Sequence, residues 1–452
     1  MSNKVDLLND DVKKVFLRYL IPSIGGMLGM ALYVLADTMF IGRGIGSQGL
    51  AALNISIPII NVFNGLGLLF GIGGATALSV SRGQNREDQV NNIFTKSLIM
   101  AFIIGVIFTI IRIFFLEELC VLLGASGKLL EMSKSYLGAL MAFSIAFLLN
   151  SALTVFVRND KAPQLAMWAM LIGSITNVIL DYIFIFEFKW GMWGAAVATG
   201  CAPIVGLIIL STHFIRKNNT IKLVKPKWDF GIIKRILSNG SSSFIIEISA
   251  GIVIFAFNNV ILGISGDLGV SAYSIIANLS LVCTAIFTGV GQAIQPIVSI
   301  NHGANKAQRV YQAVRLALYT SLGLGVMFYA IGVLFPDFLT SIFSKNNPQL
   351  EQITAQGIKI YFISFIIMGV NIAIVSYLQS IERAKISLTM SLFRGCIFMI
   401  IGLLILPRVL GLSGVWATLP FAEVITLVLS IVLFKDCREI VKYSFKKVPS
   451  RA

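Results

Sequence analysis

Long apolar stretches recur along the whole of this chain and restrict its fold more than any other feature. Each is at least about 18 residues long, which is enough to cross roughly 30 Å of hydrocarbon as a helix. In a bilayer, only helices and closed barrels satisfy their own backbone hydrogen bonds, so stretches of this length predict spanning helices. We count twelve, over residues 15–41, 50–80, 93–116, 133–157, 163–186, 192–214, 236–263, 270–300, 313–335, 358–381, 386–406 and 412–434.

The composition is that of an integral membrane protein. Of the 452 residues, 56% are hydrophobic and 13% are charged, whereas an average soluble protein has about 25% charged residues. Five dispersed cysteines and two distant histidines, His213 and His302, predict neither a disulfide framework nor a metal cluster. The sequence has no Walker lysine loop, nucleophile elbow or HExxH motif, so we expect neither ATP-driven transport nor enzymatic activity.

The positive charges are distributed as a membrane protein requires. The amino terminus, every second connection, the linker 216–235 and the carboxyl tail hold 27 of the 36 lysines and arginines. By the positive-inside rule these segments face the cytoplasm, which places both termini there. The membrane thus explains the net charge of +15 without a nucleic-acid partner, and the long first apolar stretch acts as its own insertion signal. Asp160 and Glu382, at cytoplasmic helix ends, are expected to be solvated.

The second half of the chain repeats the first at a constant offset. Segment 82–85 matches 302–305, and segment 191–194 matches 411–414. We therefore predict an all-α fold of twelve transmembrane helices in two pseudo-symmetric six-helix bundles, a 6+6 parallel repeat. Such a repeat is typical of transporters that carry substrate between the halves. The predicted parts are a first lobe over 1–215, a basic cytoplasmic linker over 216–235, a second lobe over 236–435 and a basic cytoplasmic tail over 436–452.

Two aspartates inside apolar stretches mark the first lobe as the place of function. Asp37 and Asp181 lie near the predicted outer ends of their helices, and a charge in lipid costs at least about 2.5–3.5 kcal/mol, so such acids normally face a cavity or an ion pathway. Tyr33 shares the face of Asp37 at a spacing of four residues. Asn177 shares the face of Asp181 in the same way, and Thr199 has a similar depth. The oxygens of Asp37, Asn177, Asp181 and Thr199 suit Na⁺, and two acids in apolar surroundings suit H⁺, so we predict a coupling site for one of these ions. We interpret Tyr33 as a substrate-binding or auxiliary residue.

The second lobe does not repeat this pair, because Phe257 and Ile401 stand at the positions that match the two aspartates. Its clearest buried acid is Glu247, which we interpret either as a site for a cationic substrate or as a wet structural acid near the surface. Asn150 is interpreted as an auxiliary polar group or as a contact between helices. Pro22 interrupts the first helix and, with the glycines that follow it, predicts a hinge or a static kink.

These residues resemble the multidrug and toxic compound extrusion (MATE) family, specifically its prokaryotic DinF-like branch, over nearly the whole chain. The positions that match the family's helices 1, 4, 5 and 6 are Pro22, Tyr33, Asp37, Phe40-Ile41-Gly42, Asn150, Asn177, Asp181 and Thr199. The resemblance implies a V-shaped pair of bundles in a bacterial cell membrane, drug extrusion, and coupling to H⁺ or Na⁺ through the first lobe. Glu247 resembles the helix 7 acid of the NorM-like branch, but Asn371 and Gln379 stand where that branch has a helix 10 aspartate.

We therefore expect a secondary active multidrug antiporter, monomeric among membrane lipids, that exports apolar, cationic small molecules in exchange for H⁺ or Na⁺. A second hypothesis is a flippase for lipid-linked saccharides of the same superfamily, which needs a cationic cavity for diphosphate. A third is a membrane enzyme acting on lipid or isoprenoid phosphates, whose paired acidic or His-Arg motifs are missing. A porter of the major facilitator type also fits twelve helices, but segment 82–85 does not carry that family's basic loop motif.

Overall fold

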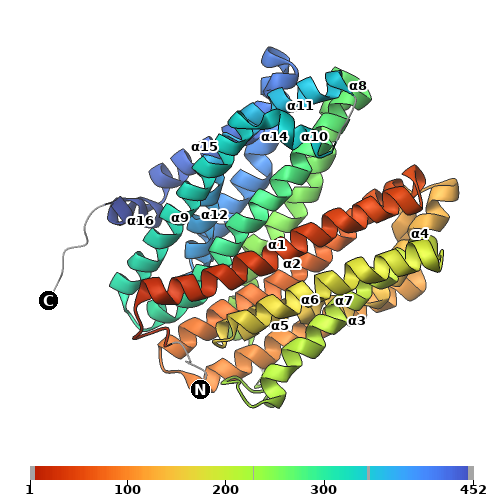
Figure 1. Ribbon diagram of the computed structural model, residues 1–452. Helices are drawn as coiled ribbons and strands as arrows, with labels where there is room; N and C mark the ends of the chain where they lie inside the picture. Colours follow the sequence, from red (N-terminus) through yellow and green to blue (C-terminus); the bar gives the residue numbers. More distant parts are fainter. Residues whose placement is uncertain (1–5, 228, 344–346, 446–452) are drawn as a thin grey trace. The chain divides into compact units, whose positions relative to one another are not determined.

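The computed structural model describes residues 6–227, 229–343 and 347–445, and every regular element in these ranges is a helix (Figure 1). Two of the helices, η1 and η2, are π-helical turns. The elements are α1 (Val12–Gly44), α2 (Ser47–Gly83), α3 (Glu87–Leu122), α4 (Gly127–Ala142), α5 (Ser144–Asn159), α6 (Pro163–Tyr182), η1 (Ile183–Glu187), α7 (Gly191–Ile215), α8 (Phe230–Gly303), α9 (Ala307–Leu334), α10 (Pro336–Ser341), α11 (Pro348–Tyr361), α12 (Ser364–Ser380), α13 (Ala384–Leu392), η2 (Phe393–Ile397), α14 (Phe398–Leu410), α15 (Leu412–Leu433) and α16 (Lys435–Phe445).

The described helices provide the twelve predicted membrane crossings. Nine are long and apolar enough to cross a membrane singly, with α6–η1 and α13–η2–α14 each counted as one. The pairs α4–α5 and α11–α12, bent by 52° and 46°, provide two more. The last comes from α8, whose 74 residues are too long for one crossing and are broken at Gly266, where φ is 60° and ψ is −155°. Glycine adopts this backbone conformation without the strain that a side chain would add.

The contacts divide the chain into two compact units, and two helices belong to both. Among the described residues, unit 1 contains those between 21 and 248, and unit 2 contains those from 6 to 20 and between 249 and 445. Helix α1 changes unit between Leu20 and Ile21, directly before Pro22, and α8 changes unit between Ile248 and Ser249. Each unit therefore includes the first part of a helix whose longer remainder belongs to the other unit.

In unit 1, the linker that precedes α8 is hydrogen-bonded to the first turns of α3. The Asn91 side-chain oxygen accepts from Lys222 N at 2.8 Å, and Thr95 Oγ1 accepts from Val224 N at 3.0 Å. The Lys96 ammonium donates to the carbonyl oxygen of Asp229 at 3.0 Å. These contacts hold the basic linker against the unit by its backbone rather than by its charges.

Asp160 fastens the same linker, and the expectation that this acid is solvated is wrong. Its side chain is about 1% exposed and accepts hydrogen bonds from Thr220 N at 2.7 Å, from the Thr220 hydroxyl and from His213 Nε2 at 2.9 Å. Arg82 Nη1 forms a salt bridge with it at 3.3 Å. Burial raises the pKa of the Asp160 carboxyl, but the hydrogen bonds and the arginine outweigh burial and hold the pKa below its ordinary value.

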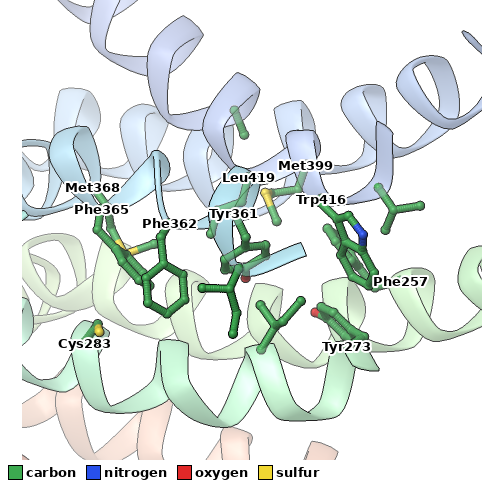
Figure 2. Close-up of a cluster of buried hydrophobic side chains, with 14 of the residues drawn as sticks. Phe257, Tyr273, Cys283, Tyr361, Phe362, Phe365, Met368, Met399, Trp416 and Leu419 are labelled. Atoms are coloured by element: carbon green, nitrogen blue, oxygen red, sulfur yellow. The ribbon is translucent and has the colours of Figure 1, made fainter. Parts of the chain in front are cut away.

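Unit 2 holds the amino-terminal segment in a comparable way. Arg309 Nη2 donates to the carbonyl oxygens of Leu7 and Asp10 at 3.1 and 2.6 Å, and Asn301 Nδ2 donates to that of Leu7 at 3.0 Å. The core of the unit is a cluster of aromatic, aliphatic and sulfur-containing side chains from α8, α11, α12, α14 and α15 (Figure 2). Trp416 and Phe365 are among its fully buried members.

Candidate functional site

Small residues in α1 bring α1 and α6 close together above Pro22. A Cβ atom at Gly26 would lie 2.8 Å from Met170 Sδ, and one at Gly29 would lie 2.5 Å from Leu171 Cδ2. Side chains at these positions would push the helices apart, so the glycines serve close packing of α1 on α6. The helix itself continues through Pro22 from Val12 to Gly44. This contact sets the distance between the two helices that carry the aspartates.

Asp37 of α1 and Asp181 of α6 meet inside unit 1. Asp37 is 7% exposed and Asp181 is fully buried, and their carboxyl groups are within hydrogen-bonding reach of each other. The Oδ1 atoms of both are buried without a hydrogen-bond partner. None of the salt bridges or side-chain hydrogen bonds found among the described residues connects either acid to a lysine, arginine or histidine. The site therefore offers two buried carboxylates with free oxygen atoms and no compensating cation.

The other predicted polar groups surround this pair. With its amide oriented to suit its neighbours, Asn177 donates from Nδ2 to Asp181 Oδ2 at 3.1 Å and accepts from Thr199 N at 3.3 Å. Tyr33 lies within electrostatic range of both carboxylates. The sequence analysis missed Tyr136 of α4, which is fully buried near the same groups and whose hydroxyl has no hydrogen-bond partner. It lies in the apolar run of a different helix and has no spacing relation to the aspartates.

Aromatic contacts hold α1 and α6 in register next to the acids. The ring of Phe40, three residues after Asp37, packs against Tyr182 at a centroid distance of 6.4 Å and against Phe186 at 5.8 Å. The π-helical turn η1 begins two residues after Asp181 and leads to the exposed Trp190, in a cluster of aromatic rings. Tryptophan and other amphipathic aromatic residues favour the membrane–water interface, so we expect the two acids to lie a few helical turns from that interface.

Two further predicted residues lie away from the pair. Asn150 of α5 faces Gly206 of α7, which is seven residues, or about 10 Å, along that helix from Thr199. Glu247 lies beside Gly65 of α2, in the part of α8 that belongs to unit 1, and its side chain is partly exposed. In the described part of unit 2, the most buried acid is instead Glu423 of α15, at 1%.

Glu423 belongs to a polar cluster that the sequence analysis missed. Its Oε1 accepts from Arg394 Nε at 2.7 Å, and its Oε2 accepts from Asn371 Nδ2 at 2.7 Å. Arg394 and Glu423 are visible in the sequence as the charges inside the last two apolar stretches. Their pairing is not, because they belong to different stretches and the geometry depends on how two helices pack.

Twelve apolar helices in two repeats, with buried acids that face each other inside a membrane span, define a secondary transporter. The model of the MatE family matches residues 22–183 and 244–404, one segment in each repeat. The chain therefore belongs to the MatE family, whose members are multi-pass membrane transporters and not enzymes.

Known transporters are similar to this chain in sequence or fold over nearly its full length. The chain is 27% identical to the multidrug export protein MepA of Staphylococcus saprophyticus, over 92% of this chain and 91% of that protein. Its fold is similar to a structure described as the outward-facing conformation of a multidrug resistance MATE family transporter, with a TM-score of 0.89, 24% identity and 99% coverage of both chains. It is also similar to a MATE crystal structure in the straight conformation, with a TM-score of 0.91, 22% identity, and 98% and 99% coverage.

Proposed function

We propose that this chain is an antiporter that exports apolar, cationic small molecules in exchange for H⁺ or Na⁺. One observation carries the coupling: Asp37 and Asp181 are buried side by side, each with an unpartnered oxygen and without a cation. Carboxylate oxygens in this setting take up a proton or, together with the Asn177 and Thr199 oxygens, coordinate a sodium ion.

The coupling follows from the charge of the pair. With no ion bound, two acids that face each other in an apolar bundle repel, and a bound H⁺ or Na⁺ relieves that repulsion. The ion drives transport to the extent that it binds one arrangement of unit 1 more tightly than another. Helix α1 carries both Asp37 and Pro22, so a change in bend at Pro22 is the movement that we assign to this step.

The direction and the cargo are part of the proposal. We propose that both termini face the cytoplasm of a bacterial cell and that the aspartates lie in the outer half of the membrane; the positive charges of the linker, tail and alternate connections support this orientation. Relatives of similar length are named multidrug export proteins, which supports a broad range of small organic molecules as cargo. We propose that the monomer carries out the cycle.

Transport in vesicles tests this function. Everted membrane vesicles are loaded with ethidium under a proton gradient or a sodium gradient, and each gradient is dissipated in turn. We expect accumulation to stop with one of the two and to be abolished by Asp37→Asn and by Asp181→Asn. The matched control is Asp267→Asn, which makes the same chemical change at an exposed acid. Unchanged accumulation by Asp37→Asn at equal expression would refute the coupling role.

A further inference from the structure

The cluster of Arg394, Glu423 and Asn371 is built as a site and not as an isolated ion pair. Glu423 is 1% exposed and Asn371 is fully buried, and each Glu423 oxygen has a different donor at 2.7 Å. Asn371 Nδ2 also donates to the backbone oxygen of Glu423 at 2.9 Å, which fixes the Asn371 amide of α12 against α15. The acid is therefore held in one orientation between α12 and η2.

The π-helical turn η2 directs Arg394 into unit 2. Arg394 lies in η2, and its Nε atom contacts Glu423 of α15, a residue that is buried in the unit. One helical turn before Arg394, Ser391 is buried as well. The guanidinium thus lies on the inward face of its helix, and 14% of the side chain remains exposed. The Arg394 side chain is therefore not completely enclosed by the core.

Much of the hydrogen-bonding capacity of the cluster is unused. Arg394 donates to Glu423 from Nε, and its Nη1 and Nη2 groups, with four N–H donors, have no hydrogen bond to any residue in the described ranges. Asn371 Oδ1 is buried without a partner. In an apolar bundle, such donors and acceptors are costly unless water or a ligand satisfies them.

We propose that this cluster binds the carboxylate of apolar compounds that also carry an N–H donor beside it. The two Nη groups of an arginine form parallel hydrogen bonds to the two oxygens of a carboxylate, a geometry that a point charge does not provide. The Asn371 oxygen accepts from the neighbouring N–H of the compound. A cation is a poor ligand here, because the unused groups of Arg394 are N–H donors and both Glu423 oxygens already accept hydrogen bonds.

The surroundings suit the apolar part of such a compound. Ile372 and Ala422, each next to a cluster residue in the chain, belong to the apolar core. The same core contains Met368, Met399 and Leu419 (Figure 2). Thioether side chains adapt to ligands of different shape. The inference that the cluster is a transport site for organic acids rests on the proposed export function. It adds acids and zwitterions to the compounds that the protein exports.

Binding to the purified full chain in lipid nanodiscs tests the inference. The probe is dansylglycine, a fluorescent carboxylate with an adjacent sulfonamide N–H, and the matched neutral probe is dansylglycinamide. Empty nanodiscs correct for partition into lipid. We expect the acid to bind about tenfold more tightly than the amide, as two charge-assisted hydrogen bonds predict. Equal binding of the two probes by the wild-type chain overturns the proposal without any variant.

Three variants identify the site. The double variant Arg394→Met/Glu423→Gln keeps the cluster neutral and should bind acid and amide equally. Arg394→Lys keeps the charge but loses the two-nitrogen fork, so its preference for the acid should fall to about threefold or less. The control Arg408→Lys makes the same change at an exposed arginine and should behave as the wild type. A preference for the acid that persists in the folded double variant would place the carboxylate elsewhere.

The measurement separates this inference from the proposed function. Binding is recorded in nanodiscs without an ion gradient, so it does not depend on coupling through Asp37 and Asp181. Loss of export with intact preference for dansylglycine contradicts the coupling proposal alone, and intact ethidium export with no preference for the acid contradicts the carboxylate site alone.

Discussion

The two units each bury acids among apolar helices, but they treat the charge in opposite ways. In unit 1, Asp37 and Asp181 face each other with no cation beside them. In unit 2, Glu423 is paired with Arg394 at 2.7 Å and with an amide donor. An acid pair without a partner responds to an arriving H⁺ or Na⁺, whereas an acid that carries its own counter-ion does not. The comparison therefore supports the proposals of ion coupling in unit 1 and of ligand recognition in unit 2.

The internal repeat shows how the difference arose on one scaffold. The positions of Asp37 and Asp181 are occupied in the second half by Phe257 and Ile401. Conversely, the positions of Arg394 and Glu423 are occupied in the first half by Ser174 and Pro203, which carry no charge. Ser174 shares α6 with Asp181, whereas Pro203 lies in α7 and Asp37 in α1, so the two sites share only one pair of corresponding helices. The two halves therefore have equivalent helices but carry their buried charged residues at different positions.

The largest effect is expected from removing one partner of the charge pair in unit 2. Arg394→Met leaves Glu423 buried and unpaired, which should cost about 3–5 kcal/mol of unfolding free energy. The double variant Arg394→Met/Glu423→Gln should recover most of that loss. Asp37→Asn, which removes an acid that has no counter-ion, should change the stability by less than about 1 kcal/mol. Thermal unfolding in detergent measures all three, and similar losses for Arg394→Met and Asp37→Asn would remove the contrast between the units.

Asp160 sharpens the comparison, because it is an acid of unit 1 that does have cationic and hydrogen-bonding partners. Asp160→Asn should cost about 1.5–3 kcal/mol at neutral pH. Since its neighbours hold the pKa of the carboxyl below its ordinary value, this stabilisation is present above about pH 4 and is lost as the pH falls through the lowered pKa.

The pH dependence provides the measurement for Asp160. Unfolding midpoints of the wild type and Asp160→Asn should differ at pH 7 and converge in acid. Asp267→Asn, at an exposed acid, is the control and should follow the wild type throughout. A difference between wild type and Asp160→Asn that is the same at both pH values would show that the carboxylate charge is not what holds Thr220.

A smaller effect tests how the acid pair of unit 1 is held in place. Gly29→Ala puts a methyl group 2.5 Å from Leu171 Cδ2 and should cost about 1 kcal/mol, because the Leu171 side chain has to move within the contact between α1 and α6. Gly323→Ala in α9 is the matched change, because its methyl group meets no atom within 4 Å. It should be neutral or stabilising by up to about 1 kcal/mol through helix propensity. Equal unfolding midpoints for the two variants would show that close packing at Gly29 is dispensable.

Much of the fold follows from residues that can be recognised one at a time. Apolar length predicts each crossing, and the constant offset between matching segments predicts the two repeats. The sequence did not predict that the first parts of α1 and α8 belong to a different unit from the rest of each helix. Hydropathy describes each helix by itself and does not indicate the helix on which it packs. The prediction that Asp160 is solvated was wrong for a related reason. Its position at a helix end predicts exposure to solvent, but the folded linker covers its side chain with Thr220.

For the sites, the sequence by itself determined which ionisable groups enter the membrane, because an acid or arginine within an apolar stretch is costly and conspicuous. Asp37, Asp181 and the one-turn spacing of Asn177 follow from that alone. Tertiary structure decided which of these charges meet. It brought two acids together where α1 packs on α6, and it paired Glu423 of α15 with Arg394 of the π-helical turn η2. Whether a buried charge has a counter-ion depends on atoms a few ångströms away in space. These atoms belong to helices that are far apart in the sequence, and their separation in the sequence does not predict the contact.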